Sequence, residues 1–320
     1  MKKNLMALFI LALVFVMTIC SSRSFAAPFP TRPIELVSGY APGSAQDTFV
    51  RMIHKAIIDN NLTNAVVNIV NKEGGSTATS LAYVNAHKGD GHYLLAGGVN
   101  FLTTPMLSDL GFDYNDFTHI AMMANDPVMI CARADSGLKL LDDLRERELL
   151  SCGGAGIGNV LYVSAKNLGE KLGKEINYIP FQGTNDTIIA LLGGDIDLGS
   201  INVSMAAEYI ADGQFVCLAV LTEERLKVFA DIPTAIEQGY DLSFSTFRGI
   251  AAPKDIPQEA IDFYVDLLTR VNESKTWQEE YLDLYNLAPT FLVGQECKDA
   301  YDYYYEVLRK SLVDVGLIKQ

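Results

Sequence analysis

The chain has 320 residues, of which 49% are hydrophobic, and it carries 39 Asp and Glu residues against 25 Lys and Arg residues, a formal net charge of −14. This length and hydrophobic content are sufficient to bury one large core or two ordinary ones, which excludes a disordered protein. The acidic balance argues against nucleic acid or an anionic membrane surface as a partner.

Residues 1–26 have the pattern of an export signal. Two lysines precede an apolar run from Leu5 to Cys20, and Ser24-Phe25-Ala26 offers small residues at the two positions that a cleavage site requires. The run is shorter than the roughly 20 residues that span a bilayer, which favours cleavage over an uncleaved anchor. Cys20 raises the alternative of a lipoprotein, but the bulky Ile19 disfavours it because lipid-attachment signals have a small residue there. We therefore expect a periplasmic protein with a cleavable signal peptide.

Cleavage after residue 26 would remove three of the 25 basic residues and none of the 39 acidic ones, so the formal charge would fall from −14 to −17. Local groups would then have to hold any anionic ligand, because the overall field repels it. Four cysteines would remain, at positions 131, 152, 217 and 297, with no C-x-x-C pair. They could form disulfides in an exported protein, but the apolar surroundings of Cys131 and Cys217 favour two buried small side chains.

Strand-like and helix-like segments alternate along the rest of the chain. Short apolar, β-branched runs predict strands at 34–37, 66–70, 93–96, 128–132, 176–179, 196–198, 215–221 and 249–252. Apolar residues at helical spacing predict helices between them, for example at Phe49, Ile53, Ala56 and Ile57, and at Leu138, Leu141, Leu144 and Leu149. Such alternation predicts an α/β protein with largely parallel sheets covered on both faces.

The C-terminal third is more helical. Pro257 opens a predicted helix that runs to about Glu273, and a last helix is predicted from Lys298 to Val315.

Glycines stand where the strand-like runs end, at Gly43, Gly74-Gly75, Gly97-Gly98, 153–156 and Gly183. In open α/β sheets, ligands bind beyond the carboxyl ends of the strands, where backbone N–H groups and helix N-termini face a crevice. Several such ends that converge would make an anion site without requiring Arg or Lys.

Two of these strand ends allow two interpretations. In Tyr40–Asp47, "YAPGSAQD", Ser44 and Asp47 fit a capping box at the start of a helix, while Gly43 would let a ligand approach the backbone. The segment Cys152–Asn159, "CGGAGIGN", lacks the G-x-G-x-x-G spacing of a dinucleotide site. It leads into a helix predicted near Val160, and it is either an anion-binding loop or a flexible turn.

The sequence predicts no catalytic residue, metal site or cofactor. The four histidines are His54, His87, His92 and His119, and none has metal-ligand spacing. No G-x-S-x-G motif occurs, and Cys152 has no neighbouring His or Asn partner set that would make it a nucleophile. An exported α/β enzyme is therefore disfavoured.

Five further segments follow one another in a specific order. They read "PTRPIELVSGYAPGSAQDTFVR", "VNKEGGSTATSLAYVNAHKGDGHYLLAGG", "YIPFQGTNDTIIALLGGDIDL", "DIPTAIEQGY" and "FRGIAAPKDIPQEAID". This order resembles the extracytoplasmic solute receptors of the tripartite tricarboxylate transporter family, often called Bug receptors, from about Phe29 to Val271. No single segment is diagnostic, but the five together are specific.

The resemblance implies a type II periplasmic binding protein, in which two doubly wound α/β domains close around a ligand like a Venus flytrap. Domain 1 would comprise 27–126 and 247–320, domain 2 would comprise 127–246, and the chain would cross the hinge near 125–128 and 245–249. The implied function is capture of a small organic carboxylate and its delivery to the membrane permease subunits, by a monomeric receptor that is not an enzyme. A ligand sensor with the same fold, acting in signalling, stays open as the alternative.

In the family, backbone groups and bridging waters hold most of the ligand carboxylate. The residues that the resemblance assigns to the binding site are Tyr40, Pro42, Gly43, Ser44, Asp47, Asn100, Phe101, Gly154, Gly156, Asn159, Gln182, Gly183, Thr184, Asn202 and Arg248. Two of them depart from the family pattern, since Ser44 replaces a glycine and Gln182 replaces a frequent lysine. Arg248 would either bind the carboxylate in a bidentate manner or form a structural ion pair.

Overall fold

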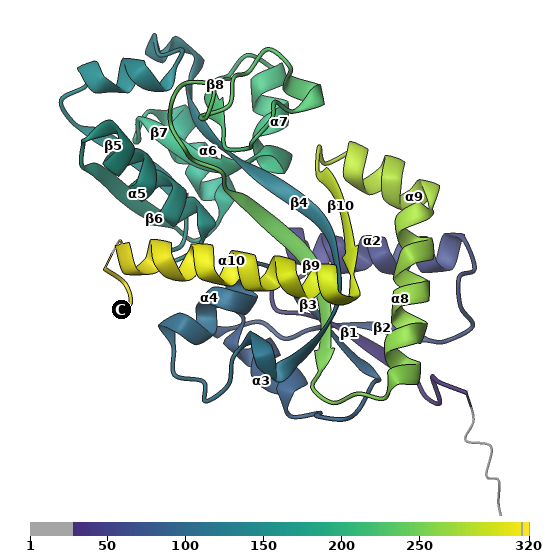
Figure 1. The fold of residues 1–320 in the computed structure, drawn as a ribbon. Coiled ribbons are helices and arrows are strands. Elements are labelled where there is room, and N and C mark those ends of the chain that lie inside the picture. The colour runs from purple at the N-terminus through teal and green to yellow at the C-terminus, as the bar shows by residue number, and fades with distance from the viewer. Residues whose placement is uncertain (1–27, 315, 320) are drawn as a thin grey trace, which may run out of the picture.

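A computed structural model of the chain describes residues 28–314 and 316–319, in which two α/β halves share a pair of long strands (Figure 1). The predicted export signal, Cys20 and the predicted helix end at Val315 lie outside the described residues. Within the described part of the chain, no helix is both long enough and apolar enough to cross a membrane.

The first half contains three parallel strands in the order β2 (Val67–Asn71), β1 (Ile34–Ser38) and β3 (Tyr93–Gly97). Strand β9 (Ser245–Pro253) pairs antiparallel with β3, β4 (Phe117–Arg133) pairs with β9, and β10 (Ala288–Val293) pairs with β4. Branched and long apolar side chains such as Ile34, Leu36 and Val37 are buried on both faces of this sheet.

The second half is built on the far end of β4. There β4 pairs antiparallel with β7 (Leu198–Asn202) and with β8 (Phe215–Val220), and β7 is followed in the sheet by the parallel strands β5 (Leu150–Ala155) and β6 (Ile176–Phe181).

Helices cover both faces of each half. In the first half, α2 (Ala45–Asp59), α8 (Gln258–Glu273), α9 (Lys275–Trp277) and a π-helical turn (Gln278–Asp283) pack on one face, and α3 (Ala78–Asn85), α4 (Val99–Leu107) and α10 (Gly294–Asp314) on the other. In the second half, α5 (Val160–Leu172) packs on one face, and α6 (Thr184–Gly193) and α7 (Val203–Ala211) on the other. Short 3-10 turns lie at Gly75–Thr77, Tyr114–Asp116, Ala134–Ser136, Leu141–Glu146 and Lys227–Phe229.

The carboxyl ends of the parallel strands in both halves point toward the junction between the halves. In the first half, the end of β3 at Gly97 lies opposite Gly249 in the middle of β9, and the preceding residues of β9 come from the second half. In the second half, β7 ends at Asn202, which lies opposite Val128. Of the β4 residues that pair with β7, Val128 is the nearest to the first half. The strand ends therefore converge as the sequence predicted.

Helix α10 is held against the junction by close packing on two glycines. Tyr301 of α10 is fully buried, and a Cβ atom on Gly249 would lie 2.3 Å from the Tyr301 hydroxyl oxygen and 2.8 Å from the Ala121 carbonyl oxygen. A Cβ atom on Gly97 would lie 3.2 Å from the same hydroxyl. Only glycine fits opposite this tyrosine at Gly249, so α10 lies directly on the shared strands.

Most of the predicted elements are confirmed, and the differences have physical causes. The strands predicted at 34–37, 66–70, 93–96, 128–132, 176–179, 196–198, 215–221 and 249–252 each overlap an observed strand, although 196–198 shares only Leu198 with β7, and Pro257 does open α8. The prediction of a helix through Leu138 and Leu149 was wrong, because only a 3-10 turn forms at Leu141–Glu146 and Leu149 is 87% exposed. Strands β5 and β10 and the first part of β4 were not predicted, and α10 begins four residues before the predicted Lys298.

Candidate functional site

The turn Tyr40–Asp47 is held by its own side chains. The Ser44 hydroxyl accepts a hydrogen bond of 3.2 Å from the Asp47 backbone N–H, which confirms Ser44 as the N-cap of α2. The Asp47 carboxylate accepts from the backbone N–H of Gly43 at 2.8 Å. The predicted capping box is therefore altered, because Asp47 reaches one residue further back than the cap. Gly43 is exposed and has a φ of +84°, a conformation that favours glycine.

Asp47 itself is fully buried and has two further donors. Its carboxylate accepts from Arg51 Nε at 2.6 Å and from Asn71 Nδ2 at 2.8 Å, and Asn71 also donates to the Tyr40 carbonyl at 2.9 Å. Burial alone would raise the pKa of Asp47, but the hydrogen bonds from Arg51, Asn71 and Gly43 outweigh it and lower the pKa below its ordinary value. The carboxylate is thus occupied in shaping the loop.

A cavity of about 270 Å³ lies beyond the carboxyl ends of β2 and β3, between the two halves. Its lining residues are Gly75, Ser76, Asn100, Thr103, Thr104, Leu107 and Ser108 of the first half and Ile157 of the second half. Asn100 is in the predicted set and lines this cavity, but Phe101 does not. Phe101 is 2% exposed and packs edge-on against Phe117 and Tyr301.

The polar side chains Ser76, Thr103 and Thr104 of this cavity were not predicted from the sequence. Thr104 donates to the Ser76 carbonyl at 2.5 Å. Ser76 and Thr77 have φ values of +52° and +81°, a strained conformation for residues other than glycine. A left-handed conformation at Ser or Thr leaves no trace in the composition. The only feature of the sequence that pointed to this part of the site was therefore Gly74-Gly75.

In the second half, the loop before α5 is shaped by packing and capping. Asn159 is the N-cap of α5, and its Oδ1 accepts from the backbone N–H groups of Leu161 at 3.0 Å and Tyr162 at 3.1 Å. Gly154 lies within β5, where a Cβ atom would be 2.4 Å from the Tyr178 hydroxyl. Gly156 has a φ of +68° and is followed by Ile157, which lines the cavity. The segment Cys152–Asn159 is therefore a strand end followed by a glycine turn that leads into the capped start of α5.

The N-terminus of α6 is open. Its N-cap Gly183 provides no side-chain cap, and a Cβ atom on Gly183 would meet no atom within 4 Å. Gln182 is exposed and Thr184 is half-buried beside it. Helix α4 also begins without a side-chain cap, at Gly98. These two helix starts, one from each half, present unpaired backbone N–H groups and the positive end of a helix dipole at the junction.

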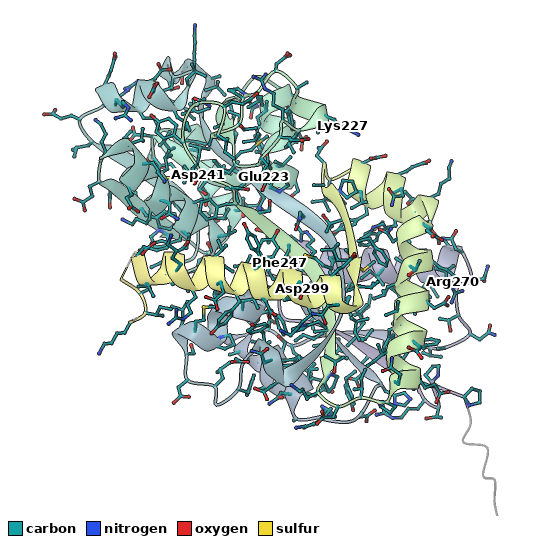
Figure 2. The ribbon with its side chains drawn as sticks, viewed as in Figure 1. Glu223, Lys227, Asp241, Phe247, Arg270 and Asp299 are labelled. Carbon is teal, nitrogen blue, oxygen red and sulfur yellow. The ribbon has the colours of Figure 1, made fainter. Side chains whose placement is uncertain are left out.

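Asn202 ends β7, opposite Val128 of β4, and Arg248 lies in β9 directly after Phe247, which Figure 2 labels near the centre of the molecule. Asn202 Nδ2 donates to the Asp126 carbonyl at 2.9 Å and to the Thr246 hydroxyl at 3.1 Å. Arg248 Nη2 pairs with Asp126 Oδ2 at 2.6 Å, and Nη1 donates to the Ala45 carbonyl at 3.0 Å. Of the two interpretations of Arg248, the structure shows the ion pair.

Asp126 also caps α7. Its Oδ1 accepts from the Ser204 backbone N–H at 3.2 Å, and its Oδ2 accepts from the Ser204 hydroxyl at 2.6 Å. A continuous chain of hydrogen bonds therefore runs from the first residue of α2 through Arg248 and Asp126 to the start of α7. It connects the two halves through the shared strands.

His119 and the four described cysteines are buried in the packing. His119 stacks on Tyr301 with ring centroids 4.4 Å apart, and burial is the main cause that lowers the pKa of His119 to about 4. Burial also raises the pKa of the Cys152 thiol to about 12. Cys131, Cys152, Cys217 and Cys297 are all free and buried, as predicted for Cys131 and Cys217. No cluster of three or more potential metal ligands occurs among residues 28–314 and 316–319.

Comparison with known proteins connects this geometry to one family. A family model described as "Tripartite tricarboxylate transporter family receptor" matches residues 50–289. A UPF0065 protein of Bordetella pertussis is 29% identical over 226 residues, which cover 68% of this chain and 69% of the relative. The protein BugT of the same organism is 26% identical over 270 residues, which cover 79% and 81%.

Three solved structures share the fold. A TctC solute-binding protein from Polaromonas has a TM-score of 0.77 and 26% identity, covering 89% of this chain and 99% of that one. A protein of R. palustris solved with adipate has a TM-score of 0.78 and 22% identity, covering 90% and 98%. MatC from Rhodopseudomonas palustris, solved with malate, has a TM-score of 0.69 and 23% identity, covering 89% and 98%. These similarities confirm the type II periplasmic binding protein fold.

Proposed function

Because the chain belongs to the tripartite tricarboxylate transporter receptor family, whose members are solute-binding proteins and not enzymes, we propose that it captures a small organic carboxylate between its two halves and delivers it to a permease of the tripartite tricarboxylate type. The proposed location is the periplasm, and the proposed receptor is a monomer.

The observation that carries this proposal is the pair of uncapped helix N-termini at the junction. Gly98 and Gly183 are the N-caps of α4 and α6, and neither provides a side-chain cap; each follows the carboxyl end of a parallel strand, β3 in the first half and β6 in the second. Backbone N–H groups and helix dipoles attract a carboxylate without adding a fixed positive charge. Neutral donors suit a receptor that must release its ligand, because they hold an anion less tightly than a buried arginine would.

We assign the predicted site residues to two roles. The backbone of Tyr40–Ser44 and the side chain of Asn100 would contact the ligand from the first half. Gly156 and 182–184 would contact it from the second half. Asp47, Phe101, Gly154, Asn159, Asn202 and Arg248 would position these loops and the crossing strands, because their side chains or backbones are already occupied by protein partners.

The motion that we propose is closure of two domains, 27–126 with 247–320 and 127–246, about the crossing strands. Hinged closure of α/β domains around a ligand is common in periplasmic binding proteins. The two structural neighbours solved with malate and adipate support dicarboxylates as the first class to test.

The test is a thermal-shift screen of the chain without residues 1–26. It would cover mono-, di- and tricarboxylates, acidic amino acids and aromatic acids. A ligand present at 100 times its Kd should stabilise the folded protein by about 2.7 kcal/mol. The proposal fails if no carboxylate raises the melting temperature while a sugar or a metal ion does.

Gly183→Ala tests the role of α6 in the same assay. The added methyl group enters open space at a φ that alanine accepts, so the melting temperature without ligand should stay unchanged. The methyl group should weaken carboxylate binding, because it would occupy the approach to the free N–H groups. Binding equal to that of the unchanged protein would remove α6 from the site.

A further inference from the structure

Two of the four described cysteines lie side by side on neighbouring strands. Cys131 of β4 stands directly opposite Cys217 of β8 in the antiparallel register. The pairing is irregular just before Cys131, where Leu218 takes up one extra position of β8. Both cysteines belong to the hydrophobic cluster under α6 and α7, so their side chains point to the same face of the sheet. They are 0% and 6% exposed, and both are free thiols in the structure.

The register places this pair within the geometry of a disulfide. Directly opposed residues of an antiparallel pair have Cα atoms about 4.5 or 5.5 Å apart. Disulfides span Cα separations of about 4.4–6.8 Å. Burial raises the pKa of Cys217, and the neighbouring Cys131 thiol raises it further, so the two sulfur atoms are close in space. Rotation about the Cα–Cβ bonds would therefore join them without a change of strand register.

The other two described cysteines cannot reach this pair. Cys152 lies in β5, which β7 separates from β4. Two strand spacings amount to about 10 Å, more than the roughly 7 Å that a disulfide can bridge. Cys152 also packs in the cluster on the opposite face of the sheet, and Cys297 belongs to α10, which packs on the first half. The fold therefore selects Cys131 and Cys217 as partners.

We propose that Cys131 and Cys217 form a disulfide when the chain is exported. Disulfides form and persist in oxidising compartments such as the bacterial periplasm. The two thiols lose two protons and two electrons as their sulfur–sulfur bond forms, and the disulfide of oxidised glutathione or of a thiol–disulfide oxidoreductase accepts them and becomes two thiols. The exchange takes place while the chain folds, because both sulfur atoms are buried afterwards. This inference rests on export and not on the proposed carboxylate capture.

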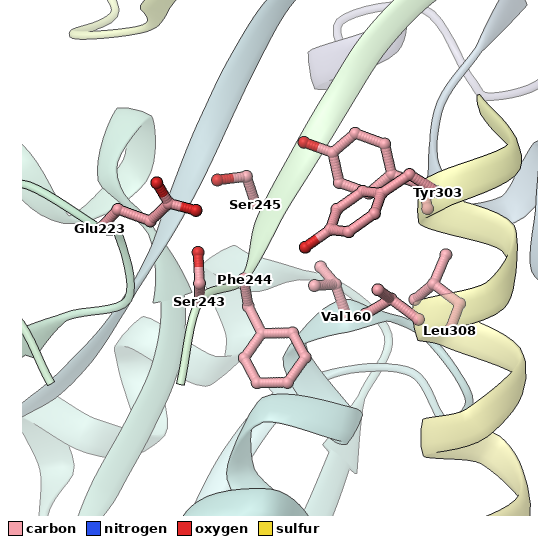
Figure 3. A pocket seen from close by; sticks show the side chains of 9 residues that line it. Val160, Glu223, Ser243, Phe244, Ser245, Tyr303 and Leu308 are labelled. Carbon is pink, nitrogen blue, oxygen red and sulfur yellow. The ribbon is translucent and has the colours of Figure 1, made fainter. Parts of the chain in front are cut away.

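The bond would fasten a strand that has one free edge. Among the described strands, β8 pairs only with β4. After β8 the chain runs through 221–244 to β9, so β8 is the start of the connection that leads back to the first half. Figure 3 shows a hollow of about 120 Å³ between the ends of this connection, at Glu223 and Ser243, and Tyr303 of α10. Packing on α10 is incomplete there, which leaves β8 to anchor the connection.

The test counts thiols in the chain without residues 1–26, exported by a bacterial host behind a cleavable signal and purified without reductant. N-ethylmaleimide in denaturant should label two of the four cysteines, Cys152 and Cys297, and all four after reduction. Mass spectrometry of the unreduced digest should find the peptides of Cys131 and Cys217 joined, with a mass two hydrogens below their sum. Four labelled thiols before reduction, or a bond between any other pair, would overturn the proposal.

Two matched variants separate the bond from the packing of the side chains. The unchanged protein, reduced in denaturant and refolded with reductant, should melt about 5–10 °C lower than the oxidised protein. Cys217→Ala should melt at one temperature with or without reductant, since it has no bond to lose, whatever its own packing defect. Cys297→Ala removes a thiol outside the pair and should keep the full response to reductant. If the unchanged protein responds to reductant no more than Cys217→Ala does, the two cysteines are not joined.

Discussion

Asp47 illustrates how one buried carboxylate determines the shape of a candidate binding loop. It is fully buried, and it accepts hydrogen bonds from Gly43 in the loop, Arg51 in α2 and Asn71 in β2. Buried charges of this kind are tolerated only when they are well paired. The loop therefore keeps the exposed N–H groups near Gly43 in one arrangement, which lowers the entropy that a ligand would lose on binding.

Asp47→Asn should destabilise the protein at neutral pH. The amide can replace only part of the acceptor capacity, and its NH₂ group would face donors, so we expect a cost of about 1–3 kcal/mol in the free energy of unfolding. The folded pKa of Asp47 lies below its unfolded value, so its contribution is present above the unfolded pKa and is lost as pH falls through the folded pKa. Urea unfolding measured between pH 7 and pH 3 should show that the difference in the free energy of unfolding between Asp47→Asn and the unchanged protein becomes smaller toward pH 3.

Asp59→Asn is the control for this experiment. Asp59 also pairs with a lysine four residues away on α2, but both side chains are exposed. Loss of the Asp59 charge should therefore change the free energy of unfolding little at any pH. A difference between Asp47→Asn and the unchanged protein that stays constant from pH 7 to pH 3 would contradict the proposed role of the charge.

At the residue scale, the sequence revealed partners that are close in the chain and missed those that are far. Ser44 as a cap follows from its spacing to Asp47, because capping is a local interaction. The bond from Asn71 to Asp47 joins residues 24 positions apart, and the pair Arg248–Asp126 joins residues 122 apart. Such pairs depend on the register of strands, which composition and spacing do not encode.

At the element scale, two of the strands that were missed carry glycines or pair at an edge. β5 contains Gly153 and Gly154 and was interpreted as part of a loop. Both glycines are required by close packing, since a Cβ atom on Gly153 would lie 2.6 Å from Ile196 Cδ1. β10 is only half-buried and its strand character comes from pairing with β4. Strands with an uninterrupted apolar run, such as β3 and β8, were found, whereas the largely buried first part of β4, which contains His119, Asn125 and Asp126, was missed.

The ion pair between β4 and β9 should stabilise the protein much more than an exposed ion pair with the same distance between nitrogen and oxygen. Arg248 and Asp126 have side chains 9% and 2% exposed, whereas Arg270 and Asp266 on α8 are 40% and 65% exposed, and both pairs are 2.6 Å apart. Asp126→Asn leaves a buried guanidinium uncompensated and should cost about 3–5 kcal/mol. Asp266→Asn should cost no more than about 0.5 kcal/mol.

Chemical unfolding of both variants at pH 7 measures this difference. Similar losses for Asp126→Asn and Asp266→Asn would mean that the buried pair does not hold the crossing strands together. A large loss for Asp126→Asn alone would support the hydrogen-bond chain that connects α2 with α7.

At the scale of the whole molecule, the two halves are joined by the crossing strands and also contact each other away from those strands. Leu107 at the end of α4 lies against Gly158 in the loop before α5, where a Cβ atom would be 2.6 Å from Leu107 Cδ1. Leu107 also lines the 270 Å³ cavity, together with Ile157 of the same loop. This contact is made only when the halves are close together, so it should favour the closed arrangement.

Leu107→Ala should therefore shift the molecule toward a more open form. Leu107 is 41% exposed, so its truncation removes only part of a leucine's apolar burial, about 1 kcal/mol. Such a loss changes the ratio of closed to open molecules about fivefold, and small-angle scattering of the ligand-free protein should report a larger radius of gyration. Leu140→Ala is the control, because Leu140 is similarly exposed at 45% and does not line this cavity. An unchanged radius of gyration in Leu107→Ala would show that this contact does not hold the halves together.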